Sequence, residues 1–395
     1  MTLELNKIRD QLTAMGQTTA QRTLERERLM PEVRDLLSQH ADSAELLTKI
    51  RRAQAAGWFG AIPAAERIDR VFDPPPLPRR MTIIAADGSQ IYPDQHGLAL
   101  YYVINVGSIV LRLGSGATPL CETTPTIGFY DTQLYNDDDL LISSQAINAR
   151  RAVEEMAQLA KRAGEEAGPA PIVALLDGNL ALNAQHETIS ATERDELLKL
   201  YLAGLDTLKS DRVALAGFVA RSGTTSVIKL LELATCPLDE VASRVKNRKG
   251  RPFSGLIVDT RLFEGMLAPG QRSAAFQMHQ GWIRMYGEAG HTIHLFYLNV
   301  GAPNHPNIAR VEVPGWVAAD PELLGLVHGA IVEQCRVTER AYPYVLTRAD
   351  ELAVIRSDEK ANFDRLIGVE LQQRGIESHP SEKAATKALA RYGRR

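Results

Sequence analysis

The sequence predicts an α/β domain on a mixed sheet flanked by helices, preceded by an N-terminal helical arm. Apolar residues recur every three to five positions between charged ones through residues 1–57, which is typical of amphipathic helix. A proline-rich stretch, Asp73–Pro78, then interrupts the pattern. Beyond it, strand patterns come first in a hairpin and later alternate with helical patterns, which indicates a mixed sheet covered by helices.

The arm is expected to span residues 1–72 as a helical hairpin or coiled coil. Gly16 suggests a break in the helix, and Pro31 suggests a restart at a first-turn position. The alternative is a helical cap on the main domain. Consecutive prolines favour extended polyproline geometry and exclude helix, so residues 73–80 are predicted to be a linker. The main domain would then occupy residues 81–395.

After the linker, the first expected strand is 81–86, stopped by a turn at Asp87-Gly88-Ser89. Gly107 separates two apolar runs, 98–106 and 108–113, which predicts a hairpin. Further strands are expected at 171–176, 213–220, 255–258, 294–298 and 308–313, and helices at 146–167, 193–208, 226–234, 321–340 and 348–374.

Composition excludes some classes of protein. With 45% hydrophobic and 24% charged residues, the chain is neither collagen-like nor wholly disordered. The net charge of -3 lacks the basic surplus of many nucleic-acid-binding proteins. No apolar run approaches the ~20 residues of a membrane helix, and the N-terminus lacks a signal-peptide pattern, so we expect a cytoplasmic protein without membrane contact. Three widely spaced cysteines predict neither disulfides nor zinc and are expected to be buried.

Two expected strands end in the same way. Asp87 and Asp177 each follow an apolar run and precede a glycine. Adjacent strand ends would bring the two carboxylates together, and like charges at that separation need a cation such as Mg²⁺ or Mn²⁺. The alternative is that both are turn aspartates, because Asp-Gly is a common turn pair.

A third ligand is expected from the helix predicted at 146–167, which offers Glu154 and Glu155. On a helical wheel Glu154 falls opposite the apolar face, whereas Glu155 falls on its flank and can reach a site at the sheet edge. Spacing alone leaves Glu154 open. The alternative for Glu155 is a solvated i,i+4 ion pair with Arg151.

A second candidate feature is the loop 221–225, Arg-Ser-Gly-Thr-Thr, which precedes an expected helix. Its backbone N–H groups could hold a phosphate. The alternative is that Thr224 or Thr225 caps the helix. Asp259, at the end of another expected strand, is interpreted as a turn or ion-pair residue because Arg261 follows it.

From about residue 80 onward, the chain resembles the NurA nuclease family. The segments that carry the resemblance are Ala85–Ile91 with YYVINVGSI after it, Leu175–Leu180, LAGFVARSGTTSVIKLL (215–231), LFEGMLAPGQRS (262–273), FYLNVG (296–301), IARVEVPGWVA (308–318) and AYPYVLTRADELAVI (341–355). The helical arm carries no such resemblance.

The resemblance implies an RNase H-like core that cuts DNA, as exo- or endonuclease, with Mn²⁺ or Mg²⁺, two ions being expected. It implies a homodimer that works with a HerA-type hexameric ATPase in DNA end resection, double-strand break repair or defence. By position, Asp87 and Asp177 match the family's metal-binding aspartates, and Glu155 is our choice for its glutamate. Tyr342 matches a tyrosine near the active site; the alternative is a core tyrosine.

One position departs from the family pattern. Asp350 stands where the family usually has a histidine. A carboxylate still binds Mn²⁺ or Mg²⁺ but does not shuttle protons near neutral pH unless its pKa is raised. We therefore predict a site of four carboxylates, Asp87, Glu155, Asp177 and Asp350, with retained nuclease activity and altered metal preference. The alternative is a non-catalytic dimeric adaptor of the translocase.

Overall fold

The computed structural model describes residues 4–136, 139–184, 188–247, 252–338 and 340–376. The chain forms two compact units. Unit 1 comprises Met1–Pro76 and Gly217–Ala341, and unit 2 comprises Leu77–Ala216 and Tyr342–Arg395. The helices of the predicted arm belong to unit 1, and the proposed division into an arm, a linker and a domain at 81–395 stays a prediction.

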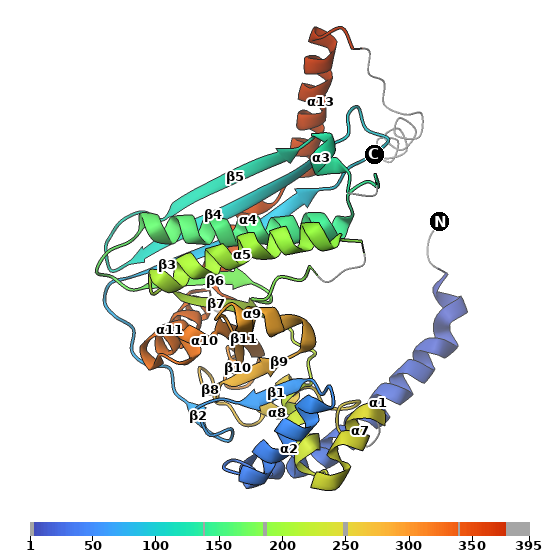
Figure 1. Cartoon of the computed structure of the whole chain (residues 1–395), viewed down its shortest axis with the longest axis vertical. Helices are drawn as coiled ribbons and strands as arrows, with labels where there is room; N and C mark the ends of the chain where they lie inside the picture. The colour runs from blue at the N-terminus through green and yellow to red at the C-terminus, as the bar shows by residue number, and fades with distance from the viewer. Residues whose placement is uncertain (1–3, 137–138, 185–187, 248–251, 339, 377–395) are drawn as a thin grey trace. The chain divides into compact units, whose positions relative to one another are not determined.

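Unit 2 is built on a mixed sheet with the RNase H-like strand arrangement that the resemblance implied (Figure 1). Three strands, β3 to β5, pair antiparallel, and β6 pairs with β3 in parallel; β7 follows β6 in the strand order. The strands are β3 (Met81–Ile91), β4 (Tyr102–Leu113), β5 (Leu120–Gly128), β6 (Ile172–Asp177) and β7 (Ala214–Val219). The fold class predicted from the sequence is confirmed.

Helices connect and cover these strands. In Figure 1, α4 and α5 lie together in front of the sheet, and α4 contacts β3, β4 and β6. A further helix, α12, packs against β3 and β4. The helices of unit 2 are α3 (Asp131–Leu134), α4 (Ser144–Glu165), α5 (Ala191–Ser210), α12 (Tyr344–Ala353) and α13 (Ser357–Gln373). The apolar face predicted for α4 is buried, as Ala149, Val153 and Met156 show.

Two turn predictions in unit 2 are wrong. β3 does not stop at Asp87, because β4 pairs with it residue by residue as far as Ile91. Gly107 is not a hairpin turn but lies in the middle of β4, opposite Asp87. A glycine inside a strand often marks a close approach of another backbone, and here that backbone is α12. A Cβ at Gly107 would lie 2.5 Å from the carbonyl oxygen of Ala349 and 2.6 Å from the amide nitrogen of Ala353.

Hydrogen bonds hold α12 against β3 and β4. The Asn105 side chain donates to the carbonyl oxygen of Ala353 at 2.8 Å, and the Ser89 hydroxyl donates to the same oxygen. Ser89 and Asn105 are a cross-strand pair, as are Asp87 and Gly107, so all four residues face α12. Gly88, between Asp87 and Ser89, faces the opposite side, toward α4.

Unit 1 contains an antiparallel sheet in the order β1-β9-β10-β11, and β11 pairs with Gly217–Val219 of β7. Besides this part of β7, the strands of unit 1 are β1 (Gly60–Pro63), β2 (Val71–Phe72), β8 (Arg272–Ser273), β9 (Phe276–His279), β10 (Ile293–Asn299) and β11 (Ile308–Pro314). Its helices are α1 (Arg9–Gln39), α2 (Ala44–Ala55), α6 (Ser226–Ala234), α7 (Val241–Asn247), α8 (Asp259–Glu264), α9 (Arg284–Glu288), α10 (Gly315–Ala318) and α11 (Pro321–Val337), with 3-10 turns at Leu5–Ile8, Leu238–Glu240 and Gly281–Ile283.

Several helix predictions need correction. α1 runs through both Gly16 and Pro31, and the chain turns only at His40–Ser43, where the Ser43 hydroxyl caps α2. Gly16 and Pro31 are exposed, so their cost to the helix is only that of their low helix propensity. The single helix expected at 348–374 is two helices, because the chain is extended between α12 and α13.

Two smaller predictions also fail. Residues 255–258 form no strand: the preceding turns lead directly into α8. Cys236 and Cys335 are buried as expected, but Cys121 is exposed on β5.

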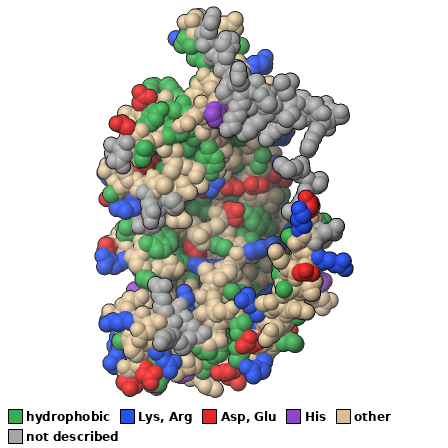
Figure 2. Space-filling model, turned by 90° about the vertical axis from the view of Figure 1, so that its right-hand side faces the viewer, with side chains coloured by type: hydrophobic (Ala, Val, Ile, Leu, Met, Phe, Trp, Pro, Cys, Tyr) green, Lys and Arg blue, Asp and Glu red, His purple; other side chains and the backbone are tan. Residues whose placement is uncertain are grey.

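The surface reflects the near-neutral charge of the sequence. Basic and acidic side chains alternate over the described residues of the face drawn in Figure 2, without a broad patch of Lys and Arg. None of the helices in the described part of the chain has the length and apolar character needed to span a membrane.

The close contact between α12 and Gly107 gives a first testable prediction. Gly107→Ala should lower the free energy of unfolding by about 1–3 kcal/mol, because its new methyl group would overlap backbone atoms of α12. Gly164→Ala, near the end of α4, meets no atom within 4 Å and should leave stability unchanged or slightly raised. Urea unfolding of both variants tests this, and equal stabilities would contradict the close approach.

Candidate active site

The parallel register of β3 and β6 places two aspartates side by side. Ala86 is paired with Leu176, so Asp87 and Asp177, the next residue of each strand, are neighbours across the pair. Gly178 has a φ of 93°, a conformation that glycine adopts readily, and it turns the chain away directly after Asp177. The backbone N–H of Gly88 donates to the Asp87 carboxylate at 2.8 Å. The structure thus brings together the two residues that the repeated strand–Asp–Gly pattern singled out.

Asp350 and Tyr342 approach these aspartates from the C-terminal part of the chain. Asp350 lies on α12, and its charge raises the pKa of both Asp87 and Asp177, so the three carboxylates are close enough to repel one another. The Tyr342 hydroxyl, two residues before α12 begins, donates a hydrogen bond to Asp177. Tyr342 is therefore a neighbour of the site.

Glu155 reaches the cluster from α4, on the other side of Gly88. A Cβ at Gly88 would lie only 2.6 Å from Glu155 Oε1, so the missing side chain makes room for this carboxylate. The charges of Asp87 and Asp177 both act on Glu155. Glu154 is directed elsewhere: its carboxylate accepts a hydrogen bond from Thr126 and interacts with Arg150. The geometry favours Glu155 over Glu154.

Burial and mutual repulsion make the charged forms of these groups costly. Burial, then the charges of Asp177 and Asp350, raise the pKa of Asp87 to about 6 against the hydrogen bond from Gly88. Burial raises the pKa of Glu155 to about 8, with Arg151 opposing the shift. The pKa of Asp177 is raised chiefly by desolvation, although its side chain stays accessible. Desolvation and the neighbouring Asp177 also raise the pKa of Tyr342, which keeps its proton.

A divalent cation fits this cluster chemically. The donor set consists only of carboxylate oxygens, which Mg²⁺ and Mn²⁺ prefer. Glu155 Oε1 is buried and accepts no hydrogen bond from the described residues. In their present rotamers, no three His, Cys, Asp or Glu side chains of the described residues are arranged to hold a metal ion. Glu155 pairs with Arg151, and Asp177 with Tyr342, so both would have to turn toward the cation.

A cavity of about 260 Å³ borders the carboxylates on the α4 side. Arg151, Glu155 and Asp177 lie in its wall, and the amides of Gln145, Asn148, Asn179 and Asn183 supply most of its remaining polar groups. The sequence pointed to Arg151 only as a surface partner of Glu155. The place of Arg151 in the wall of this cavity, beside Glu155 and Asp177, depends on side chains far apart in the sequence and was not predicted.

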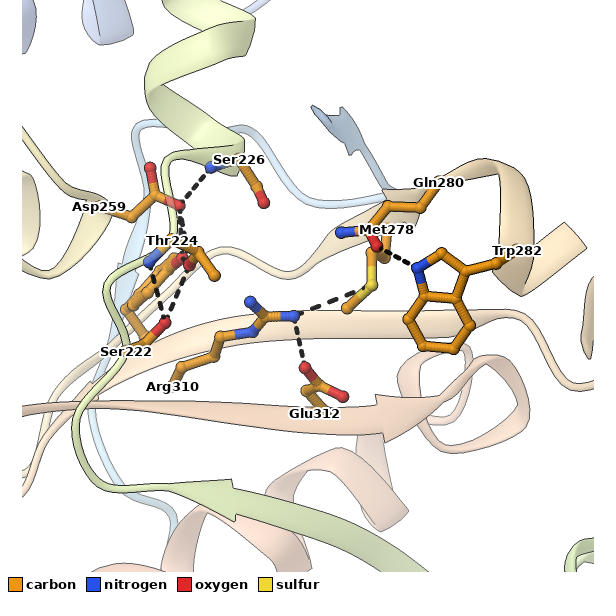
Figure 3. A network of polar contacts seen from close by, with 10 residues as sticks. Ser222, Thr224, Ser226, Asp259, Met278, Gln280, Trp282, Arg310 and Glu312 are labelled. Atoms are coloured by element: carbon orange, nitrogen blue, oxygen red, sulfur yellow. Dashed lines mark hydrogen bonds and ion pairs between the residues drawn. The ribbon is translucent and has the colours of Figure 1, made fainter. Parts of the chain in front are cut away.

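At the start of α6, which follows the loop 221–225 of unit 1, a carboxylate of the chain itself occupies the backbone N–H groups (Figure 3). The N–H groups of Ser226, Val227 and Ile228 donate to the Asp259 carboxylate at 2.7–3.0 Å. The expected threonine cap is also absent, because the Thr225 side chain makes no cap hydrogen bond. Asp259 is fully buried and also accepts from Tyr297 at 2.6 Å, so this carboxylate is the cap. It is not the turn or ion-pair residue that the sequence suggested.

A buried ion pair, Arg310 and Glu312 of β11, appears in the same view as Asp259 (Figure 3). The two side chains lie on one face of the strand, and the Arg310 guanidinium also contacts the sulfur of Met278 at 3.8 Å. Trp282, beside Met278 in the same view, donates to Gln280 at 2.8 Å. These contacts are internal to unit 1 and are not candidates for the catalytic cluster.

The family model of the NurA domain matches residues 81–355, which contain all the residues of the carboxylate cluster. The chain belongs to the NurA domain family. The crystal structure of the NurA nuclease from Sulfolobus solfataricus is similar to it, with a TM-score of 0.50 and 14% identity, covering 92% of this chain and 99% of that one. Human ENDOV matches with a TM-score of 0.34 and 13% identity, over 80% of this chain and 98% of that one. No curated protein sequence matches this one.

The raised pKa values predict how the stability of the metal-free protein depends on pH. The native state holds a proton on Glu155 up to about pH 8, whereas the unfolded chain releases it near 4.5. The free energy of unfolding should therefore fall as pH rises through this window, by at most about 1.4 kcal/mol per pH unit for one proton.

Urea unfolding in EDTA between pH 5 and pH 8 measures this slope. Glu155→Gln cannot ionise and should flatten it, while raising stability at pH 8. A slope that is the same in the variant and in the wild type would show that Glu155 does not carry the effect.

Proposed function

We propose that this NurA-family chain is a metal-dependent DNA nuclease that hydrolyses phosphodiester bonds. The observation that carries the proposal is the convergence of Asp87, Asp177, Asp350 and Glu155 from two strands and two helices. Their mutual repulsion is costly without a cation. The fold shared with the Sulfolobus NurA nuclease supports the same proposal.

The four carboxylates would hold Mn²⁺ or Mg²⁺, with two ions as the expected number. Such ions, when bound, lower the pKa of water to give a nucleophile and stabilise the leaving oxygen. Asp87 interacts electrostatically with Asp177, Asp350 and Glu155, which supports the proposal that it would be a ligand shared by the ions. Tyr342 keeps its proton and orients Asp177 through its hydrogen bond, or donates to a phosphate oxygen of the substrate.

Asp350 changes the proton chemistry of the site relative to the usual family histidine. A neutral imidazole can exchange protons near pH 7, whereas the carboxylate in its place would serve as a metal ligand or hydrogen-bond acceptor. A fourth carboxylate strengthens the attraction for hard cations. We therefore propose retained activity with a changed metal preference.

The partners follow from the family resemblance and the charge of the chain. We propose that the protein acts as a homodimer in the cytoplasm with a HerA-type hexameric ATPase that delivers DNA. The near-neutral charge and the mixed surface of the face in Figure 2 support weak unaided affinity for DNA, because nonspecific affinity depends on neutralising phosphates. The proposed pathway is DNA end resection, double-strand break repair or defence.

The site assignment predicts which carboxylates are essential. Asp87→Asn and Asp177→Asn should each lower the cleavage rate by roughly 100-fold or more, because each removes a ligand charge. Glu154→Gln is the matched control: it changes a neighbouring carboxylate that points to Thr126, and it should cut at nearly the wild-type rate. End-labelled single- and double-stranded DNA with Mn²⁺, with and without the translocase, provides the assay.

Circular dichroism of each variant separates loss of the site from loss of the fold. Near-normal cutting by Asp87→Asn would refute the site assignment. Intact DNA after incubation with wild-type protein, Mn²⁺ and translocase would instead support the non-catalytic adaptor.

The presence of Asp350 in place of the usual family histidine predicts an effect on metal preference. Asp350→His should raise the ratio of the Mn²⁺-supported to the Mg²⁺-supported rate by several-fold, because imidazole favours borderline metals over Mg²⁺. Glu351→His, the exposed neighbour on α12, is the control and should leave the ratio unchanged. An equal ratio in Asp350→His and wild type would show that Asp350 is not a ligand.

A further inference from the structure

Arg151 lies directly against the carboxylate cluster. Its Nε atom is 3.1 Å from Glu155 Oε1, and neither atom makes a hydrogen bond within the described residues. The pair contacts β3 at Gly88, where a Cβ would lie 2.7 Å from the Arg151 side chain. The positive charge of Arg151 also acts on Asp87 and Asp177. The positive charge of Arg151 therefore acts on three of the four carboxylates.

A chain of hydrogen bonds holds the other side of the guanidinium. Arg151 donates to the Gln90 side chain at 2.8 Å, Gln90 donates to the Tyr92 hydroxyl at 2.8 Å, and Tyr92 donates to Asn148 at 2.8 Å. Asn148 lies on α4, so the chain begins and ends on the same helix. The guanidinium, although partly exposed, is therefore held beside the cluster.

The contact between Arg151 and Glu155 is an ion pair without hydrogen-bond geometry. The Arg151 side chain is 31% exposed and borders the 260 Å³ cavity, whereas the Glu155 side chain is only 10% exposed. Glu155 Oε1, which is buried and accepts no hydrogen bond from the described residues, retains an unused ligand position. Arg151, whose guanidinium is held by Gln90, keeps its positive charge against this atom.

We propose that Arg151 is the internal counter-cation of the cluster: its positive charge lowers the repulsion among the carboxylates while the site lacks metal, and it opposes the binding of a divalent cation. The inference rests on the proposed function, because it requires that the cluster binds a metal. In this role Arg151 weakens the binding of the metal ion, because it is a competing cation. A residue that supports a metal site would strengthen that binding.

The electrostatic argument gives the size of the effect. A single and a double positive charge about 6 Å apart repel even at the dielectric constant of water by an amount that corresponds to roughly tenfold in affinity. Removing the charge of Arg151 should therefore tighten Mn²⁺ binding by roughly tenfold or more. Arg151→Gln removes the charge while keeping a polar side chain, and Arg151→Lys keeps the charge.

Arg150 provides a matched control on the same helix. It pairs with Glu193 and donates to Tyr102 and to the carbonyl oxygen of Gln133, and the carboxylate on which its charge acts is Glu154. Arg150→Gln makes the same change in net charge one residue away, outside the cluster. It should leave Mn²⁺ affinity within about twofold of wild type, because its charge is partly neutralised and farther from the cluster.

The test is titration of the full-length protein and these variants with Mn²⁺ alone, by calorimetry, without DNA. The expected order of affinity is Arg151→Gln tighter than wild type, with Arg151→Lys and Arg150→Gln close to wild type. Thermal unfolding with and without Mn²⁺ gives a second readout: Arg151→Gln should be less stable than wild type in EDTA and should gain more from Mn²⁺. Folding of the variant is thereby checked in the same experiment.

The outcomes separate the inference from the proposed function. Mn²⁺ binding by the wild type that is unchanged or weaker in Arg151→Gln would overturn the counter-cation role and leave the metal site standing. An increase in affinity shared by Arg150→Gln would also overturn it, because a general charge effect would then suffice. Absence of Mn²⁺ binding by the wild type would refute the metal site and the inference with it.

Discussion

The repulsion between neighbouring carboxylates is the constraint around which unit 2 is arranged. Parallel pairing of β3 with β6 sets Asp87 beside Asp177, and α12 adds Asp350 to the same face of the sheet. Glu155 enters from α4 over Gly88, the one position of β3 where no side chain blocks it. The two helices that pack onto β3, α4 and α12, therefore each bring an acidic group closer to the others. Without a cation, this arrangement keeps protons on some of the carboxyl groups, as the raised pKa values of Asp87 and Glu155 show.

Two glycines and one arginine make this arrangement possible. Gly107 lets the backbone of α12 approach β4, and Gly88 lets α4 place Glu155 against β3. Arg151 supplies a positive charge where the acidic groups meet. The glycines set the positions of the two helices, whereas Arg151 compensates for the charge that their positions create. A site of this kind needs close backbone contact and charge compensation together, because the backbone must hold the acidic side chains close despite their repulsion and a positive charge lowers that repulsion.

The sequence predicted the residues of the cluster better than the elements that carry them. The repeated strand–Asp–Gly pattern identified Asp87 and Asp177, and the helical wheel favoured Glu155. Gly88 and Gly107 were misread as turns, whereas Gly178 does end its strand. A local pattern does not distinguish a glycine that ends a strand from one that gives room to a neighbouring helix. The role of Asp259 as the cap of α6 was also missed, because its partners lie more than thirty residues away in the chain. Arg151 was seen only with its helical neighbour, since its link to Gln90 depends on tertiary packing.

The central claim is that Asp87 and Asp177, brought together by the β3–β6 register, form a metal-binding centre with Glu155 and Asp350. The most direct measurement is anomalous diffraction from a crystal soaked in Mn²⁺. The account predicts an anomalous peak within about 2.5 Å of carboxylate oxygens of both Asp87 and Asp177, with the Glu155 carboxylate turned from Arg151 toward the ion. Mn²⁺ bound only elsewhere on the protein, with Asp87 and Asp177 free of it, would contradict the account.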